Sequence, residues 1–281
     1  IEDQFTRPET TTLEALMVAG FSEPIINSFF RPFLGGIFLD ADLTTSSRML
    51  DFVFRMFSSG NACLPDTGME AIPRQLADNL RPGTVQLNSP VAAVEPSKIR
   101  LCSGQEIAAQ AVVVASDGPS AARLLGTAEP VSGQGVTCLY FAATKPPIDR
   151  PILLLNGEGR GPINNLCVPT AAASRYGPAG KSLISVTVLG KVGDSDQLLI
   201  EVLDQLQEWF GAQVNRWNHL RTYRIPYALP SQPSPALNEP ERAVRWKPGL
   251  YICGDHRDNA SIQGAMTSGR RTAEAVLEDL S

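Results

Sequence analysis

The residues best placed to bind a charged ligand lie near the end of the chain, in the stretch 250–280, which reads LYICGDHRDNASIQGAMTSGRRTAEAVLEDL. Residues 250–253 form a short apolar run typical of a β-strand, and Gly254 and Asp255 interrupt it. A polar loop then leads to a predicted helix with Ser261 as its N-cap. The first N–H groups of a helix have no partner within it and carry partial positive charge, which suits an anionic group. The pattern therefore predicts a ligand site at the strand end and the helix tip.

This stretch resembles the C-terminal cofactor motif of the FAD-dependent amine oxidase and phytoene desaturase superfamily. The matching residues are Gly254, Asp255, Ser261, Ile262, Gln263, Gly264, Ala265, Ser268, Gly269 and Ala273. The resemblance implies FAD as cofactor, with Asp255 after Gly254 at the ribityl chain. It also implies that backbone N–H groups of Ile262 and Gln263 approach the pyrimidine carbonyl of the flavin. A reduced flavin carries negative charge near N1 and C2=O, where these groups and the helix dipole would stabilise it. The alternative is a strand–loop–helix unit that only packs.

Residues 84–116 alternate in polarity and predict a β-meander, with strands near 84–87, 91–95, 98–102, 106–109 and 111–115. The last of these is continuously apolar, as expected for a strand covered on both faces. By the same resemblance, the backbone of Val91 holds the adenine of FAD. The alternative for Val91 is an ordinary core valine.

Three helices are predicted in the first 60 residues, beginning after Thr11, at Ser22 and at Ser46 or Ser47. The second should end at Arg31 and Pro32 and be followed by a turn at the Gly35–Gly36 pair. The third is apolar on more than one side. This pattern indicates either a plain helical core or a pocket for a bulky apolar substrate.

The rest of the chain predicts a helix over 68–80, a short helix over 119–125 stopped by Gly126, and a strand-rich region over 131–189. A long amphipathic helix follows, capped by Asp194 or Ser195 and closed by Gly211. The Pro-rich residues 225–242 are expected to form an extended loop or crossover.

Together these elements predict a mixed α/β fold of the FAD/NAD(P)-binding, Rossmann-like type, incomplete at its N-terminus, with a substrate domain of sheet and helices. Residues 61–130 and 245–281 would form the FAD-binding domain, and residues 1–60 and 131–244 the substrate domain. The chain begins at Ile1 without Met, so we expect the C-terminal part of a longer protein, whose N-terminal remainder would be its partner.

Composition excludes several other classes. The net charge of −5 and the absence of a Lys/Arg run argue against nucleic-acid binding. No apolar run is long enough to span a membrane, which leaves peripheral contact and the compartment, cytoplasmic or organellar, open. The five cysteines show no CxxC pair and do not cluster with the two histidines, so we expect reduced core thiols and no metal site.

Two departures from the superfamily limit the interpretation. The chain has no GxGxxG loop to bind the pyrophosphate, and the glycines of 156–162 precede no helix, so they indicate a β-turn. The aromatic amine cage and the lysine near the flavin of monoamine-type oxidases are also missing. Their absence argues against true amine oxidation and favours desaturase-like or uncharacterised relatives within the superfamily.

We therefore predict the C-terminal part of an FAD-dependent oxidoreductase that removes hydride from an apolar or amphipathic organic substrate. Hydride transfer to a flavin depends on position, so no catalytic side chain is nominated. His256 and Arg257 would lie near the flavin and could tune its charge, although a solvated loop is the favoured interpretation for both. The alternative is a non-catalytic flavin-fold module that binds a lipid or a protein partner; a hydrolase is disfavoured because there is no GxSxG motif.

Overall fold

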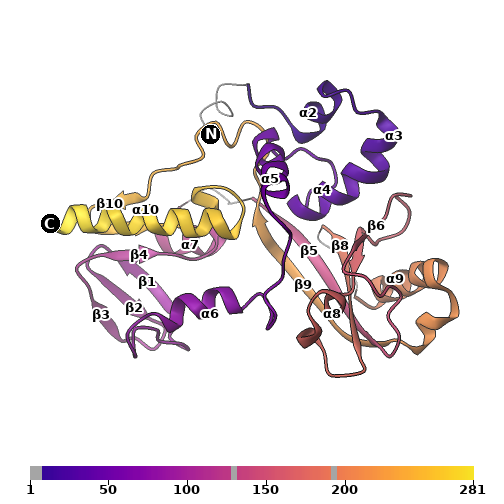
Figure 1. The fold of residues 1–281 in the computed structure, drawn as a ribbon. Coiled ribbons are helices and arrows are strands. Elements are labelled where there is room, and N and C mark those ends of the chain that lie inside the picture. The colour runs from indigo at the N-terminus through magenta and orange to yellow at the C-terminus, as the bar shows by residue number, and fades with distance from the viewer. Residues whose placement is uncertain (1–7, 128–131, 191–194) are drawn as a thin grey trace. The chain divides into compact units, whose positions relative to one another are not determined.

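A computed structural model describes residues 8–127, 132–190 and 195–281 (Figure 1). The chain divides into two compact units. The terminal unit contains residues 81–133 and 229–281 together with Pro8 and Glu9, and the sheet unit contains residues 10–80 and 134–228.

The terminal unit holds two small sheets. In the first, β1 (Val91–Glu95), β2 (Lys98–Leu101) and β3 (Glu106–Ala108) form an antiparallel meander. In the second, β11 (Leu250–Ile252) lies between β10 (Arg245–Lys247) and β4 (Val112–Val114). β11 runs parallel to β4, with Leu250 opposite Val112 and Ile252 opposite Val114. Parallel strands that are far apart in sequence require a crossover connection, so this pair joins the middle of the chain to its end.

Three helical elements accompany the parallel pair: α7 (Gly118–Leu125), the 3-10 turn η4 (Asp255–Arg257) and α10 (Ile262–Leu280). α7 follows β4 and ends at Gly126, whose φ of 68° gives the left-handed cap that glycine adopts without strain. α10 packs along the strand pair (Figure 1) through Ala275 and Val276, which contact the cluster around the buried Tyr251. The predicted helices over 119–125 and after Ser261 are confirmed.

β4 forms one edge of its sheet, because it pairs with β11 alone among the described residues. Val112 and Val114 are buried, whereas Val113 is 43% exposed. The prediction that this strand is covered on both faces is therefore wrong for the described chain. A strand at an edge presents unpaired N–H and C=O groups, so β4 could accept a further strand.

The sheet unit is built on a five-stranded antiparallel sheet with the order β6, β7, β8, β5, β9. These strands are β6 (Leu153–Leu155), β7 (Asn165–Cys167), β8 (Ser182–Leu189), β5 (Gly133–Ala143) and β9 (Asn218–Pro230). Helix α9 (Ser195–Phe210) covers one face, where Leu198, Val202 and Leu206 join the buried side chains of β5, β7 and β8. The short elements α8 (Pro169–Ala172), η2 (Ser174–Tyr176) and η3 (Gly211–Arg216) complete this part.

The first 80 residues of the chain contribute helices to the sheet unit. They are α2 (Thr12–Val18), α3 (Glu23–Ile25), η1 (Ile26–Phe30), α4 (Arg31–Phe38), α5 (Ser47–Ser59) and α6 (Ala71–Asp78). Thr11 caps α2 through a capping box with Glu14, and Ser46 caps α5. The predicted starts of both helices are confirmed.

The predicted helix end at Pro32 is wrong, because helical structure continues through η1 into α4. The N–H of Arg31 bonds to the carbonyl of Ile26, one residue farther back than in an α-helix. This π-type turn places Pro32 in the first turn of α4, where its missing N–H costs no hydrogen bond. Gly36 lies inside α4 and not in a turn; a Cβ there would lie 2.9 Å from Nδ2 of Asn164.

Two further predictions are corrected. Residues 84–87 form no strand. The Pro-rich residues 225–230 belong to β9, which is an edge strand and therefore tolerates prolines that cannot donate a hydrogen bond. The predicted cap of α9 at Asp194 lies outside the described residues.

The domain boundaries also differ from those predicted. Residues 61–80 group with the sheet unit, because Asp66 pairs with Arg175 at 3.3 Å and residues 62–64 line a hollow with β6 and β7. Residues 229–244 group with the terminal unit, where Gln232 bonds to the loop before α10.

The five cysteines differ in exposure. Cys63 and Cys102 are exposed, which corrects the expectation of five core thiols. Burial raises the pKa of the Cys138, Cys167 and Cys253 thiols, and a raised pKa lowers the thiolate fraction that reacts.

We therefore expect that alkylation of the native protein at neutral pH modifies Cys63 and Cys102 first. Cys138, Cys167 and Cys253 should react only after denaturant is added. Peptide mass mapping of a time course with iodoacetamide measures the order. Equal reaction of Cys253 and Cys63 in the native protein would contradict this burial pattern.

Candidate functional site

The candidate site lies at the carboxyl ends of the parallel strands β4 and β11. β4 continues into Ser116, and β11 continues through Cys253 and Gly254 into η4. In open α/β sheets, ligands bind outside the carboxyl ends of parallel strands. Asp255 begins η4 at this edge, as the sequence predicted from the break after the strand.

Gly254 fills a position that needs glycine. Its φ is 146°, and a Cβ there would lie 2.6 Å from Cε1 and Nδ1 of His256 and 3.2 Å from the carbonyl oxygen of Ser116. A side chain at 254 would therefore displace the imidazole or the end of β4. The N–H of Gly254 donates to Oγ of the buried Ser268 at 3.1 Å, which ties the strand end to α10.

Asp255 has one oxygen engaged and one available. Its Oδ1 accepts the backbone N–H of His256 at 2.8 Å, and its side chain is 25% exposed. No hydrogen bond from a described residue reaches Oδ2. An ionised carboxylate accepts at both oxygens, so Oδ2 can accept a hydroxyl of a ligand.

The tip of α10 is open. Oγ of Ser261 accepts the N–H of Gly264 at 3.0 Å, and the carbonyl of Ser261 accepts the N–H of Ala265. The N–H groups of Ile262 and Gln263 donate to no other described residue. The side chain of Ile262 is 47% exposed, so the tip is not covered by its own first side chain. Two unpaired donors at a helix N-terminus can bind electron-rich oxygen.

The loop between η4 and α10 is held from both sides. Gln232 donates to the carbonyl of Asp258 at 2.9 Å and accepts the N–H of Ala260 at 2.8 Å. Arg271 pairs with the buried Asp258 at 3.0 Å, with side chains only 17% and 8% exposed. These contacts fix the approach to Ser261 before any ligand binds.

The electrostatic environment of the loop is positive. Arg257 donates to the carbonyl of Ala243. Burial lowers the pKa of the Arg257 guanidinium, and the charges of Arg242 and Arg271 lower it further. The three guanidinium groups of Arg242, Arg257 and Arg271 outnumber the two carboxylates of Asp255 and Asp258 in this part of the unit, which favours a ligand with negative charge.

His256 and Arg257 do not lie in a solvated loop, contrary to the prediction from sequence. His256 is only 7% exposed, and Arg257 is half-buried. The polar residues of this segment suggested solvent exposure. In the structure the His256 imidazole instead packs against Gly254. The glycine two residues before the histidine is the only sequence signal that could have indicated this packing.

Val91 lies at the start of β1, in the first sheet of the terminal unit, whereas the other predicted residues belong to the segment after β11. It is half-buried, and the register of β1 against β2 shifts between Val91 and Ala93. Such a bulge leaves backbone groups without strand partners. No hydrogen bond between described residues links Val91 to the segment 254–263, so its contact with adenine stays a prediction.

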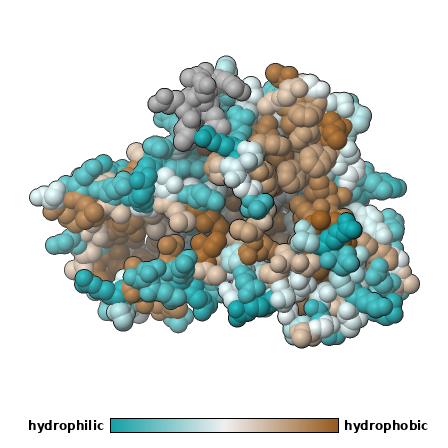
Figure 2. All heavy atoms as spheres, in the orientation of Figure 1, coloured by the Kyte–Doolittle hydropathy of each residue, from teal (hydrophilic) through white to brown (hydrophobic). Residues whose placement is uncertain are grey.

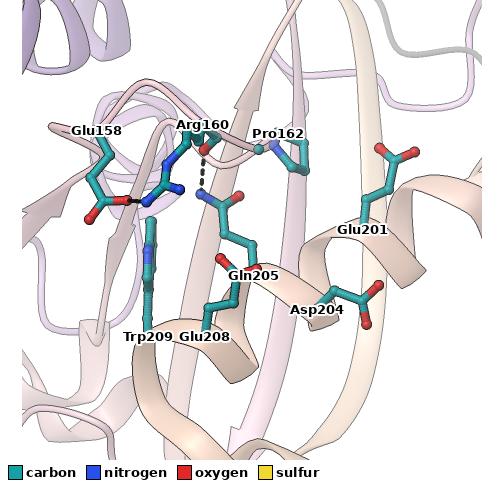
Figure 3. A pocket seen from close by; sticks show the side chains of 9 residues that line it. Glu158, Arg160, Pro162, Glu201, Asp204, Gln205, Glu208 and Trp209 are labelled. Atoms are coloured by element: carbon teal, nitrogen blue, oxygen red, sulfur yellow. Dashed lines mark hydrogen bonds and ion pairs between the residues drawn. The ribbon is translucent and has the colours of Figure 1, made fainter.

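A second hollow, of about 470 Å³, lies in the sheet unit (Figure 3). Its carboxylates come from Glu158, Glu201, Asp204 and Glu208. The polar groups at its centre are already paired, because Gln205 accepts from the N–H of Ile163 at 3.0 Å and donates to the carbonyl of Arg160 at 2.7 Å. No group of three potential metal ligands occurs among the described residues. This hollow is a packing feature of α9 and the 156–162 loop.

The strand pair, the carboxylate after the glycine and the open helix tip are the features from which the sequence predicted a flavin site. The family model for flavin-containing amine oxidoreductases matches residues 2–277. The chain belongs to this family, which is a family of FAD-dependent oxidoreductases.

Individual relatives are more distant. Coproporphyrinogen III oxidase of Propionibacterium freudenreichii subsp. freudenreichii is 23% identical over 235 residues, covering 75% of this chain and 44% of the relative. The fold is similar to an oxidoreductase from Methanosarcina mazei, with a TM-score of 0.72, 17% identity and coverage of 97% of this chain and 70% of that one. The fold is also similar to reduced UDP-galactopyranose mutase, with a TM-score of 0.64 and 14% identity. The match covers 90% of this chain and 64% of that one. The chain thus spans less than half of the curated relative.

The residues present fit one part of FAD. The free Oδ2 of Asp255 suits a ribityl hydroxyl, and the N–H groups of Ile262 and Gln263 suit a flavin carbonyl. Both ring nitrogens of the buried His256 also lack a hydrogen-bond partner among the residues that the structure describes. No strand followed by a glycine-rich loop and a helix occurs in the described ranges, so the pyrophosphate is assigned to no residue of this chain.

Proposed function

We propose that the whole protein is an FAD-dependent oxidoreductase that removes hydride from an apolar or amphipathic organic substrate. The open tip of α10 beside Asp255, at the ends of two parallel strands, is the observation that carries this proposal. When bound, FAD would accept the hydride, so the substrate loses two electrons and FAD gains them.

The residues of this chain would bind and orient the cofactor. Asp255 would accept a ribityl hydroxyl, and Gly254 would keep the strand end close to α10. The N–H groups of Ile262 and Gln263 would stabilise negative charge on the flavin carbonyl, supported by the helix dipole of α10. Because these groups are fixed before binding, little reorganisation accompanies the reaction.

Support for an apolar substrate comes from the aromatic face, the exposed side chains Phe21, Phe29, Phe54, Met56 and Phe57 with the half-buried Phe33. Phe33 stacks on Phe29 at 5.4 Å and lies 5.6 Å from Phe57. Hydrophobic residues gather over α2 to α5 in Figure 2. Exposed apolar patches of this kind occur where a ligand, a membrane or a partner binds. No helix in the described ranges is both long and apolar enough to cross a bilayer.

We further propose that the pyrophosphate is held by residues outside this chain, in an N-terminal remainder of the same protein. Two observations support this: the unpaired edge of β4, where a parallel strand could add, and the 44% coverage of the curated relative.

The test compares flavins of different length. Riboflavin, FMN and FAD are titrated into the purified protein, and binding is followed by the change in flavin fluorescence and by absorbance at about 450 nm. If this chain binds mainly the ring and the ribityl chain, the three dissociation constants should agree within about threefold. Asp255→Ala should weaken all three roughly tenfold through the lost charge-assisted hydrogen bond.

Asp149→Ala, at an exposed carboxylate of the sheet unit, is the matched control and should bind all three flavins like the wild type. Markedly tighter binding of FAD than of FMN would place the phosphate or adenine on this chain and favour the Val91 contact. Absence of binding of any flavin would contradict the proposal and favour a module that binds a lipid or a protein.

A further inference from the structure

Within the part of the chain that the structure describes, the buried imidazole of His256 has no hydrogen-bond partner. It is 7% exposed, and both Nδ1 and Nε2 are buried without a partner. The other histidine of the chain, His219, bonds through Nε2 to Oγ1 of Thr222 at 2.9 Å. A buried polar side chain normally finds a partner, so the two unpaired nitrogens of His256 require an explanation.

The imidazole lies at the edge where the candidate site is built. The ring lies against Gly254, just after β11, since a Cβ on Gly254 would lie 2.6 Å from its Cε1 and Nδ1. The same Cβ would lie 3.2 Å from the carbonyl oxygen of Ser116, which follows β4. Nδ1 of the imidazole is 3.8 Å from Oδ1 of Asp255, which is too far for a hydrogen bond. The other polar contacts of this residue are made by its backbone, whose N–H bonds to Asp255 and whose carbonyl accepts from Arg242.

Packing alone does not account for a histidine at this position. A leucine or methionine of similar volume would fill the space without burying two unpaired nitrogens, which carry a desolvation cost. The glycine at 254 is also required by the position of this ring. A group that arrives with a ligand would remove the cost, because it would pair with an imidazole nitrogen already held in place.

We propose that His256 is a cofactor-binding side chain, and that its imidazole forms a hydrogen bond with a polar atom of the bound flavin. This inference rests on the proposed function and adds a residue to the site. Asp255 can only accept hydrogen bonds, whereas an imidazole nitrogen that carries a proton donates. The two adjacent side chains therefore offer complementary groups to the flavin and its ribityl chain.

The experiment separates binding from folding by measuring both in the same variants. For His256→Leu, the melting temperature without flavin should equal or exceed that of the wild type, because the variant removes unpaired buried nitrogens. Its dissociation constant for FAD should be about tenfold weaker, and the rise in melting temperature caused by FAD should shrink accordingly. His256→Gln, which keeps a donor and an acceptor, should recover FAD affinity to within about threefold of the wild type.

His219→Leu is the matched control, because it removes the second imidazole of the chain, which lies in the sheet unit. This variant should leave FAD affinity unchanged. A lower melting temperature of flavin-free His256→Leu with unchanged FAD affinity would assign the imidazole a structural role and overturn the inference. Equal weakening in the leucine and glutamine variants would overturn it as well. Failure of the wild type to bind FAD would instead overturn the proposed function on which the inference rests.

Discussion

Replacing Gly264 with alanine should destabilise the terminal unit by about 3 kcal/mol, because the added methyl group would overlap backbone atoms that cannot move aside without loss of other contacts. A Cβ at this position would lie 2.0 Å from the carbonyl oxygen of Asn259 and 2.9 Å from its carbonyl carbon. That carbonyl belongs to the loop that Gln232 and Arg271 hold in place. Either the loop or the first turn of α10 must move, so flavin binding at Ile262 and Gln263 should weaken together with stability.

Gly269→Ala provides a matched control on the same helix. No atom lies within 4 Å of a Cβ built at position 269. Alanine also has a higher helix propensity than glycine in a helix interior. This variant should be more stable than the wild type by about 1 kcal/mol. Urea unfolding followed by circular dichroism measures both changes. Similar effects of the two alanines would show that the contact between Gly264 and Asn259 does not constrain the loop.

Asp40→Ala should cost the sheet unit about 4 kcal/mol, since it leaves several buried donors without an acceptor. Asp40 is 6% exposed. Its Oδ1 accepts the N–H of Asp42 at 3.1 Å, and its Oδ2 accepts the N–H of Thr45 at 2.8 Å and the hydroxyls of Thr44 and Thr45, each at 2.9 Å.

The same carboxylate holds a strained turn between α4 and α5. Leu39 and Leu43 have φ values of 55° and 57°, which residues other than glycine, asparagine and aspartate rarely adopt. Without Asp40, these two residues should relax and α5 should lose its fixed start at Ser46. Denaturant unfolding gives the loss in free energy. Asp42→Ala, which removes an exposed carboxylate from the same turn, should change stability by less than about 0.5 kcal/mol. Equal losses in both variants would contradict the role of Asp40.

Local signals in the sequence predicted the elements that carry the candidate site. The apolar run before Gly254, the cap at Ser261 and the apolar spacing of α10 depend on neighbours within a few residues, and all three are found. The same holds for α7, which begins after Asp117 and ends at Gly126. The resemblance to the flavoprotein family rested on this stretch, and the match of the family model to residues 2–277 confirms it.

Features that depend on distant partners were missed. His256 is buried just after β11, a strand that pairs with β4 more than one hundred residues earlier in the chain. The exposure of Val113 depends on which strands flank β4, and an apolar run of three valines carries no information about its neighbours. Gly264 and Gly269 both belong to the motif that matches the superfamily, yet of these two only a Cβ on Gly264 would meet another backbone.

Local patterns in the sequence were enough to predict that a strand, a glycine, a carboxylate and a capped helix follow one another at the end of this chain, and they indicated the family to which the protein belongs. Hydrogen bonds and caps between near neighbours are sufficient for that, because they do not depend on the rest of the fold. The three-dimensional fold was needed to show that this strand pairs with Val112–Val114, that the helix tip stays open, and that His256 is buried without a partner among the described residues. These properties arise from packing between segments distant in sequence, whose contacts no local pattern encodes.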